Sequence, residues 1–206
     1  MSEIDAAFAS RISLLASGGR CAHIYVVCDE SGAMVGEKVM ALERAVSEMI
    51  SYFKSLPLDS RIPLVHLDVV AYSDAARLES SGIVNDEYKP PTFLAGGPSS
   101  LGAGLAMIAG LIRGLPPTGW HKPVVVLMAE GYPTDDFPSG LRALNTALRS
   151  GEIGRVAIGV GSSAPIEELR AFAGDGGMVR VCDPGDLEKE VQDVLPRILG
   201  IWASTS

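Results

Sequence analysis

Continuous apolar runs alternate along this chain with segments in which apolar residues recur every three or four positions. A continuous run indicates a strand buried on both faces, whereas spacings of three and four indicate a helix with one buried side. The strand-like runs are HIYVVC at 23–28, LVHLDVVAY at 64–72, VVVLMA at 124–129, RVAIGV at 155–160 and MVRVC at 178–182.

Helical patterns fill the intervals between these runs. Their apolar faces extend over 39–53, 101–112, 141–148, 166–172 and 187–198, and Pro57 ends the first of them. Residues 76–84 follow a Ser73–Asp74 turn and predict a short antiparallel edge strand. Strand–helix alternation predicts an α/β fold in which helices cover both faces of a doubly wound, mostly parallel central sheet.

The chain of 206 residues has the length of one domain. Near its start, Ile4, Phe8, Ile12 and Leu15 follow helical spacing, and Ser17-Gly18-Gly19 then breaks the pattern. We therefore expect an N-terminal amphipathic helix and linker at 1–20, the domain itself at 21–200, and a C-terminal tail at 201–206.

Composition narrows the classes of function. The apolar fraction of 47% is enough for a sizeable core, and the net charge of −8 disfavours a nucleic-acid-binding surface, which needs clustered Lys and Arg. No stretch approaches the roughly 20 apolar residues of a membrane span, so we expect no membrane contact.

The three cysteines, Cys21, Cys28 and Cys182, suggest neither a disulfide framework nor a zinc-ligand spacing. Glu3 and Asp5 stand where a secretion signal would be basic. These features predict a protein of the reducing cytoplasm.

Oxygen-bearing side chains follow three of the predicted strands or precede the next helix. VVCDESGAM supplies Asp29 and Ser31, GGPSSLG supplies Ser99 and Ser100, and AEGYPTDD supplies Glu130. Loops at the carboxyl ends of parallel strands meet at one edge of the sheet, where such folds bind their ligands. Carboxylates and hydroxyls are the ligands that Mg²⁺ prefers, so the pattern predicts a candidate magnesium site.

These loops resemble the metal-ion-dependent adhesion site of the von Willebrand factor A domain. That family carries Asp-x-Ser-x-Ser on the first loop, Thr on the second and Asp on the third. The resemblance matches the first Asp and Ser to Asp29 and Ser31, the Thr to Ser99 and the last Asp to Glu130. The second Ser falls on Ala33, which has no ligand atom, so the implied metal site is degenerate.

Within that family the chain is most similar to the TerY-like branch of tellurium-resistance and stress operons, over roughly residues 22–200. AEGYPTDDF is similar to the TDGxPTDDW of that branch, and GGPSSLGAGL to its GGTxLGxAL. The resemblance implies a non-enzymatic protein–protein interaction module in a bacterial signalling system. It also implies that an Asp or Glu of the partner completes the coordination of the ion, and that a protein kinase and a protein phosphatase are operon partners.

Two alternatives stay open. Because Ala33 lacks a hydroxyl and Glu130 is one methylene longer than Asp, Asp29 and Ser31 can instead hold the loops together in a metal-independent scaffold. An Asp after the first strand also fits a phosphatase-like hydrolase, although the second Asp of such enzymes would fall on Ser31.

Other polar residues have structural interpretations. His23 and His66 lie in strand patterns and His121 just before one, which favours a structural role for all three. Asp135 and Asp136 precede a helix and are interpreted as caps of its N-terminus.

Overall fold

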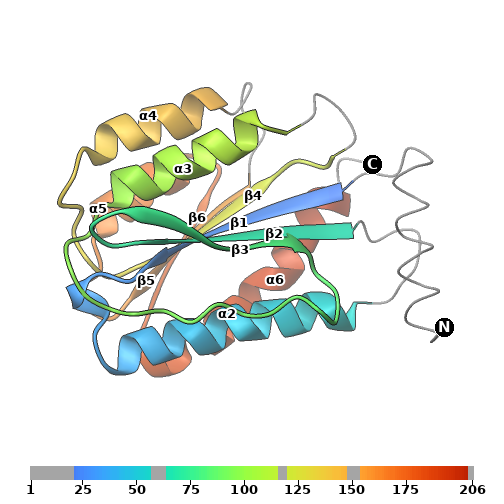
Figure 1. Ribbon diagram of the computed structural model, residues 1–206, viewed down its shortest axis with the longest axis horizontal. Helices are drawn as coiled ribbons and strands as arrows, with labels where there is room; N and C mark the ends of the chain where they lie inside the picture. The colour runs from blue at the N-terminus through green and yellow to red at the C-terminus, as the bar shows by residue number, and fades with distance from the viewer. Residues whose placement is uncertain (1–20, 57–63, 116–119, 148–153, 204–206) are drawn as a thin grey trace.

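The computed structural model describes residues 21–56, 64–115, 120–147 and 154–203. The predicted helix within residues 1–20 lies outside the described residues, as does Pro57. Within the described part of the chain, helices cover both faces of one central sheet (Figure 1).

The described sheet has six strands in the order β3-β2-β1-β4-β5-β6. All neighbouring strands are parallel except β2 and β3, which are antiparallel, so the predicted edge strand and mostly parallel sheet are confirmed. The strands are β1 (Cys21–Asp29), β2 (Leu64–Tyr72), β3 (Ala76–Ile83), β4 (Val124–Ala129), β5 (Gly154–Val160) and β6 (Met178–Cys182).

The helices divide between the two faces of the sheet, as Figure 1 shows. One face carries α2 (Glu37–Ser55) and α6 (Leu187–Ala203). The other carries α3 (Leu101–Arg113), α4 (Phe137–Ala147) and α5 (Ile166–Ala173). Two short 3₁₀ helices, η1 (Gly32–Met34) and η2 (Pro184–Asp186), complete the described elements.

Alternation along the central strands produces a separate hydrophobic core on each face. Ile24 and Val26 of β1 pack in the cluster under α2 and α6, whereas Tyr25 and Val27 pack under α3, α4 and α5. Both sets are buried, which explains why the strand sequences read as continuous apolar runs.

The end of the domain differs from the prediction. We expected a tail from residue 201, but α6 continues to Ala203 and buries Trp202, which is 2% exposed. The Trp202 indole N–H donates to the Lys122 carbonyl at 2.9 Å. Burial of this large ring extends the helix beyond the last residue of the recognisable apolar spacing.

Cys21, Cys28 and Cys182 are all free thiols. The absence of a disulfide framework among them agrees with the interpretation from their spacing. No helix of the described residues combines the length and apolar character needed to cross a bilayer.

The order of the strands places a topological switch point between β1 and β4. The chain runs from β1 to β2 on one side and returns to the other side of β1 for β4, so the connections diverge between these two strands. A crevice forms beyond the carboxyl ends of strands at such a point. Asp29 ends β1, and Glu130 directly follows β4, so both residues lie at this crevice.

Candidate functional site

Asp29 joins the first and third loops. Its Oδ1 accepts the N–H of Ser31 at 2.8 Å, and its Oδ2 accepts the N–H groups of Glu130 at 3.1 Å and Gly131 at 2.8 Å. The side chain is fully buried, so these hydrogen bonds replace the water that would otherwise solvate its carboxylate. The residue predicted as a metal ligand is therefore also a structural clamp.

Ser31 and Ser99 converge on the backbone of Gly131. A Cβ atom added to Gly131 would lie 2.9 Å from the Ser31 Oγ and 3.1 Å from the Ser99 Oγ. The Ser31 hydroxyl is buried and has no hydrogen-bond partner among the described residues. Two hydroxyls from different loops thus meet at the crevice, one of them without a partner, which is the arrangement that the candidate metal site requires.

Backbone hydrogen bonds fix the three loops to one another. The Gly32 N–H donates to the Gly97 carbonyl at 2.9 Å, and the Gly96 N–H donates to the Glu30 carbonyl at 2.8 Å. On the other side, the Thr134 N–H donates to the Ser99 carbonyl at 2.8 Å. These hydrogen bonds hold the three loops together at the crevice.

Glu130 does not face the hydroxyls as a free carboxylate. Its Oε1 lies 2.7 Å from the Nζ of Lys38, whose ammonium also donates to the Ala33 carbonyl at 3.2 Å. The Glu130 side chain is 5% exposed, and its Oε2 is buried without a hydrogen-bond partner in the described part of the chain. Lys38 was not predicted as a site residue, because a lone lysine in the first turn of a helix carries no sequence signal.

Glu30 lies in the first loop, and the sequence alone predicted no function for it. It is 1% exposed, and one of its carboxylate oxygens lies 2.5 Å from Arg77 of β3. The hydrogen bond to Glu30 raises the pKa of Arg77. Next to this pair, an open cavity of about 640 Å³ is lined by Glu30, Ser73, Asp74, Arg77, Glu79, Thr92, Leu94, Gly96, Gly97 and Pro98.

Comparison with known proteins agrees with this geometry. The family model of the von Willebrand factor type A domain matches residues 23–194. The chain belongs to this family. A comparison with curated protein sequences finds no match.

Several solved structures show the same fold. A von Willebrand factor type A protein from Catenulispora acidiphila is 17% identical with a TM-score of 0.67, covering 88% of this chain and 43% of its own. The pilus adhesin SpaC from Lactobacillus rhamnosus GG is 12% identical with a TM-score of 0.68, covering 89% and 31%. Proximal thread matrix protein 1 from the mussel byssus, described with a zinc-occupied adhesion motif, is 19% identical with a TM-score of 0.63, covering 88% and 46%.

This chain therefore spans less than half the length of these three proteins. At these identities the likeness concerns the fold alone.

The donor atoms of this von Willebrand factor A domain fit a divalent cation in part. The Ser31 and Ser99 hydroxyls converge, and Asp29 retains about one lone pair, on Oδ1, beyond its three N–H contacts. By contrast, Ala33 supplies no side-chain oxygen, and the ammonium of Lys38 neutralises Glu130. Three side chains fit direct or water-mediated coordination, whereas Glu130 in this geometry does not.

Asp136 caps the helix that it precedes, as predicted, whereas Asp135 caps a different helix. Asp136 accepts the N–H of Ser139 at 3.0 Å at the start of α4, and this contact together with the Ser139 hydroxyl lowers the pKa of Asp136. Asp135 reaches across to α3 instead, where its two oxygens accept the N–H groups of Gly102 at 2.9 Å and Ala103 at 2.8 Å. This cap fastens the third loop to the second.

Each of the three loops also presents an exposed apolar side chain. Val35 directly follows the first loop and is 62% exposed. Leu94 precedes the second loop and is 85% exposed, and Tyr132 lies in the third loop and is 64% exposed. Large apolar groups exposed beside a functional crevice are typical of protein-binding surfaces. We refer to Val35, Leu94 and Tyr132 as the apolar rim.

Proposed function

We propose that this protein is a non-enzymatic interaction module that binds a protein partner at the carboxyl edge of its sheet. The convergence of Ser31 and Ser99 beside the buried Asp29 is the observation that carries the proposal. The apolar rim supports it, because its three exposed side chains belong to or adjoin the same loops and a partner can cover them.

A divalent cation, with Mg²⁺ as the first candidate, would be held by Asp29, Ser31 and Ser99, with water in the remaining positions. When bound, such a cation supplies an open coordination position to which a carboxylate can bind. An Asp or Glu side chain of the partner would then contact the crevice. Asp29 positions the first loop against the third through its N–H contacts, which keeps the serine hydroxyls aligned for that role.

Lys38 contacts the position at which this chain has Ala33 in place of the second serine of the family pattern. Its ammonium lies between the carbonyl of Ala33 and the carboxylate of Glu130, so a fixed positive charge is already present at the edge of the crevice. Because the ammonium neutralises Glu130, it weakens the attraction of the crevice for a cation. The arrangement supports partner binding with a weakly held ion, or without one as a metal-independent scaffold.

The hydrolase alternative has less support. A carboxylate nucleophile must be exposed to its substrate, whereas Asp29 is 0% exposed and accepts three backbone N–H groups.

The cellular role in this proposal comes from the TerY-like motifs. AEGYPTDDF and GGPSSLGAGL support assignment to the tellurium-resistance and stress branch. We accordingly propose a bacterial cytoplasmic signalling role, in which a protein kinase or phosphatase encoded nearby is a candidate partner.

Calorimetric titration with Mg²⁺ and Mn²⁺ tests the ion. We expect weak binding that Ser31→Ala lowers about tenfold, and that Ala33→Ser or Lys38→Met strengthens by adding a hydroxyl or removing the ammonium. Ser31→Ala is a cleaner probe than a change of Asp29, because the Ser31 hydroxyl makes no hydrogen bond in the described structure. If neither the native chain nor Ala33→Ser gives heat of binding at millimolar metal, ion binding is excluded and the metal-independent module is supported.

Affinity capture from native lysate tests the partner, with and without a chelator. A Leu94→Ser/Tyr132→Ser variant should lose the captured protein while unfolding at an unchanged temperature, since both side chains are exposed. Met40 is 51% exposed on α2, away from the loops, and the matched control variant Met40→Ser should still capture the protein. Equal capture by all three chains would contradict binding at the carboxyl edge.

A further inference from the structure

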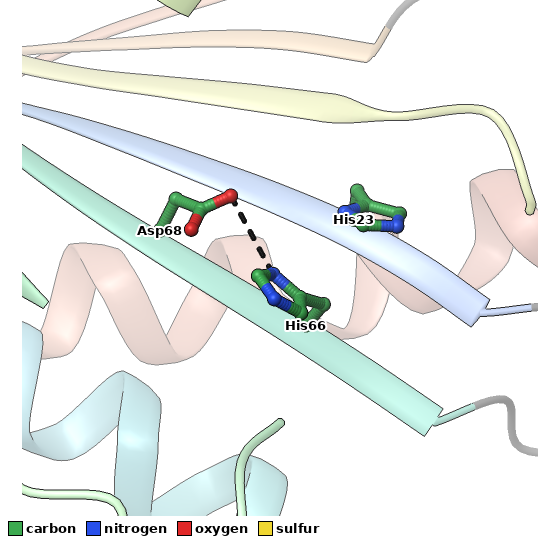
Figure 2. A group of neighbouring side chains, drawn as sticks. All are labelled: His23, His66 and Asp68. Atoms are coloured by element: carbon green, nitrogen blue, oxygen red, sulfur yellow. Dashed lines mark ion pairs between the residues drawn. The ribbon is translucent and has the colours of Figure 1, made fainter. Parts of the chain in front are cut away.

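Two histidines and an aspartate meet at the other end of the sheet. His23 of β1 is paired in register with His66 of β2, and Asp68 lies two residues further along β2 on the same face. Figure 2 shows the three side chains projecting on the same side of the two strands. His23 precedes Asp29 by six residues, a rise of about 20 Å along a strand, so this cluster is separate from the loops described above.

The spacing of the cluster suits metal coordination. One ligand atom from each of the three residues lies within 4.8 Å of the others. The Nδ1 of His66 is 3.5 Å from the Oδ2 of Asp68. Tetrahedral ligands at zinc-like bond lengths are about 3.4 Å apart, so small rotations of the imidazoles close the remaining gap.

The donor atoms also lack other partners. The Nδ1 atoms of both His23 and His66 are buried and accept or donate no hydrogen bond within the described residues. Buried polar atoms normally have a partner, and an unsatisfied one costs about 1–3 kcal/mol. A bound cation would satisfy both nitrogens at once.

The charge and access of the cluster are consistent with this role. Burial and the neighbouring His66 lower the pKa of His23 to about 4, so its imidazole is neutral near pH 7. Asp68 is 4% exposed and contributes one carboxylate. The His66 side chain is 27% exposed, which leaves a route for water to a fourth coordination position.

We propose that His23, His66 and Asp68 bind a divalent transition-metal ion, zinc in the first instance, with water as its fourth ligand. Two imidazoles and one carboxylate are a recognised zinc ligand set with an open position. The ion would link β1 to β2 near their amino ends. This inference is independent of the proposed function, because the two sites share no residue.

The test uses the full chain after treatment with a chelator. One equivalent of Zn²⁺ should bind and raise the unfolding temperature, and Co²⁺ should give the visible spectrum of a tetrahedral site. His66→Gln and the nearly isosteric Asp68→Asn should each lower the zinc affinity at least about tenfold. Circular dichroism of the metal-free variants verifies that they fold.

Control variants separate this cluster from other zinc ligands. Cys182→Ser removes a half-buried thiol on β6, and Ser31→Ala changes the opposite edge, so both should retain zinc binding. The proposal is overturned if His66→Gln and Asp68→Asn bind zinc as tightly as the native chain. Loss of zinc from Ser31→Ala alone would also overturn it, by placing the ion at the loops.

Discussion

At the scale of single residues, Asp29 combines a structural role with its proposed role as a metal ligand. Its carboxylate is withdrawn from solvent and accepts N–H groups from two loops that are about one hundred positions apart in the chain. In the proposed site, the cation and the fold would therefore depend on the same side chain. Ser31 and Ser99, by contrast, approach Gly131 without bearing a comparable share of the hydrogen bonding.

Asp29→Asn should lower the free energy of unfolding by about 1.5–3 kcal/mol in metal-free buffer, because hydrogen bonds to a charged group are lost and an amide donor faces backbone N–H groups. Chemical denaturation measures the change. Asp193→Asn on the exposed side of α6 is the matched control and should change stability by less than about 0.5 kcal/mol. Equal stabilities of the two variants would show that Asp29 is not a clamp.

At the scale of elements, α3 and α4 pack closely because glycine lies at their crossing. A Cβ added to Gly140 of α4 would lie 2.2 Å from the carbonyl oxygen of Gly102 on α3. Asp135 caps α3 from the loop that precedes α4, and Ser100, at the N-cap position itself, makes no side-chain cap. The helices are thus joined both at their crossing and at their ends, which positions Ser99 at the crevice.

Gly140→Ala should therefore destabilise the protein by about 1–3 kcal/mol, since the new methyl group must displace backbone. Gly110→Ala in α3 provides the opposite case, because a Cβ there meets nothing within 4 Å. That change should stabilise the protein by about 0.5–1 kcal/mol, as alanine restricts the unfolded chain and favours helix. Thermal unfolding of both variants compares them, and a shift of the same sign would contradict the packing described here.

At the scale of the whole molecule, the sheet separates two sets of polar groups. The loops lie at the carboxyl ends of β1 and β4, and the histidine cluster lies near the amino ends of β1 and β2. His23 and Asp29 are six residues apart on β1, a distance of about 20 Å along the strand, and the two sites share no residue. The two sites are expected to bind their ligands independently.

Mn²⁺ titration of the chain loaded with one equivalent of Zn²⁺ should consequently give an affinity within about twofold of the zinc-free value, because the two sites share no ligand and lie about 20 Å apart along β1. The same titration of Asp68→Asn controls for zinc at the loops. A tenfold change that Asp68→Asn abolishes would reveal coupling through the strands.

The meeting of the loop residues at one edge of the sheet was predictable from the sequence, whereas the charge balance of the crevice was not. Asp29, Ser31 and Ser99 follow or precede elements whose ends must share one edge of a parallel sheet, so their meeting follows from topology. Lys38 and Glu130 are far apart in the sequence, so their ion pair could be recognised only from the tertiary structure. The proximity of His23 and His66 was likewise not predicted, and both were interpreted as structural. The sequence of one strand does not indicate which residue of the neighbouring strand it pairs with.

The sequence by itself determined the fold class and the order of the elements, since apolar periodicity reports directly whether a segment is buried on one side or two. Only the tertiary structure decided that Asp29 clamps two loops, that Lys38 neutralises Glu130, that Asp135 caps a distant helix, and that α6 extends to Ala203. These contacts join residues far apart in the chain, and local periodicity carries no record of which distant groups a side chain will meet.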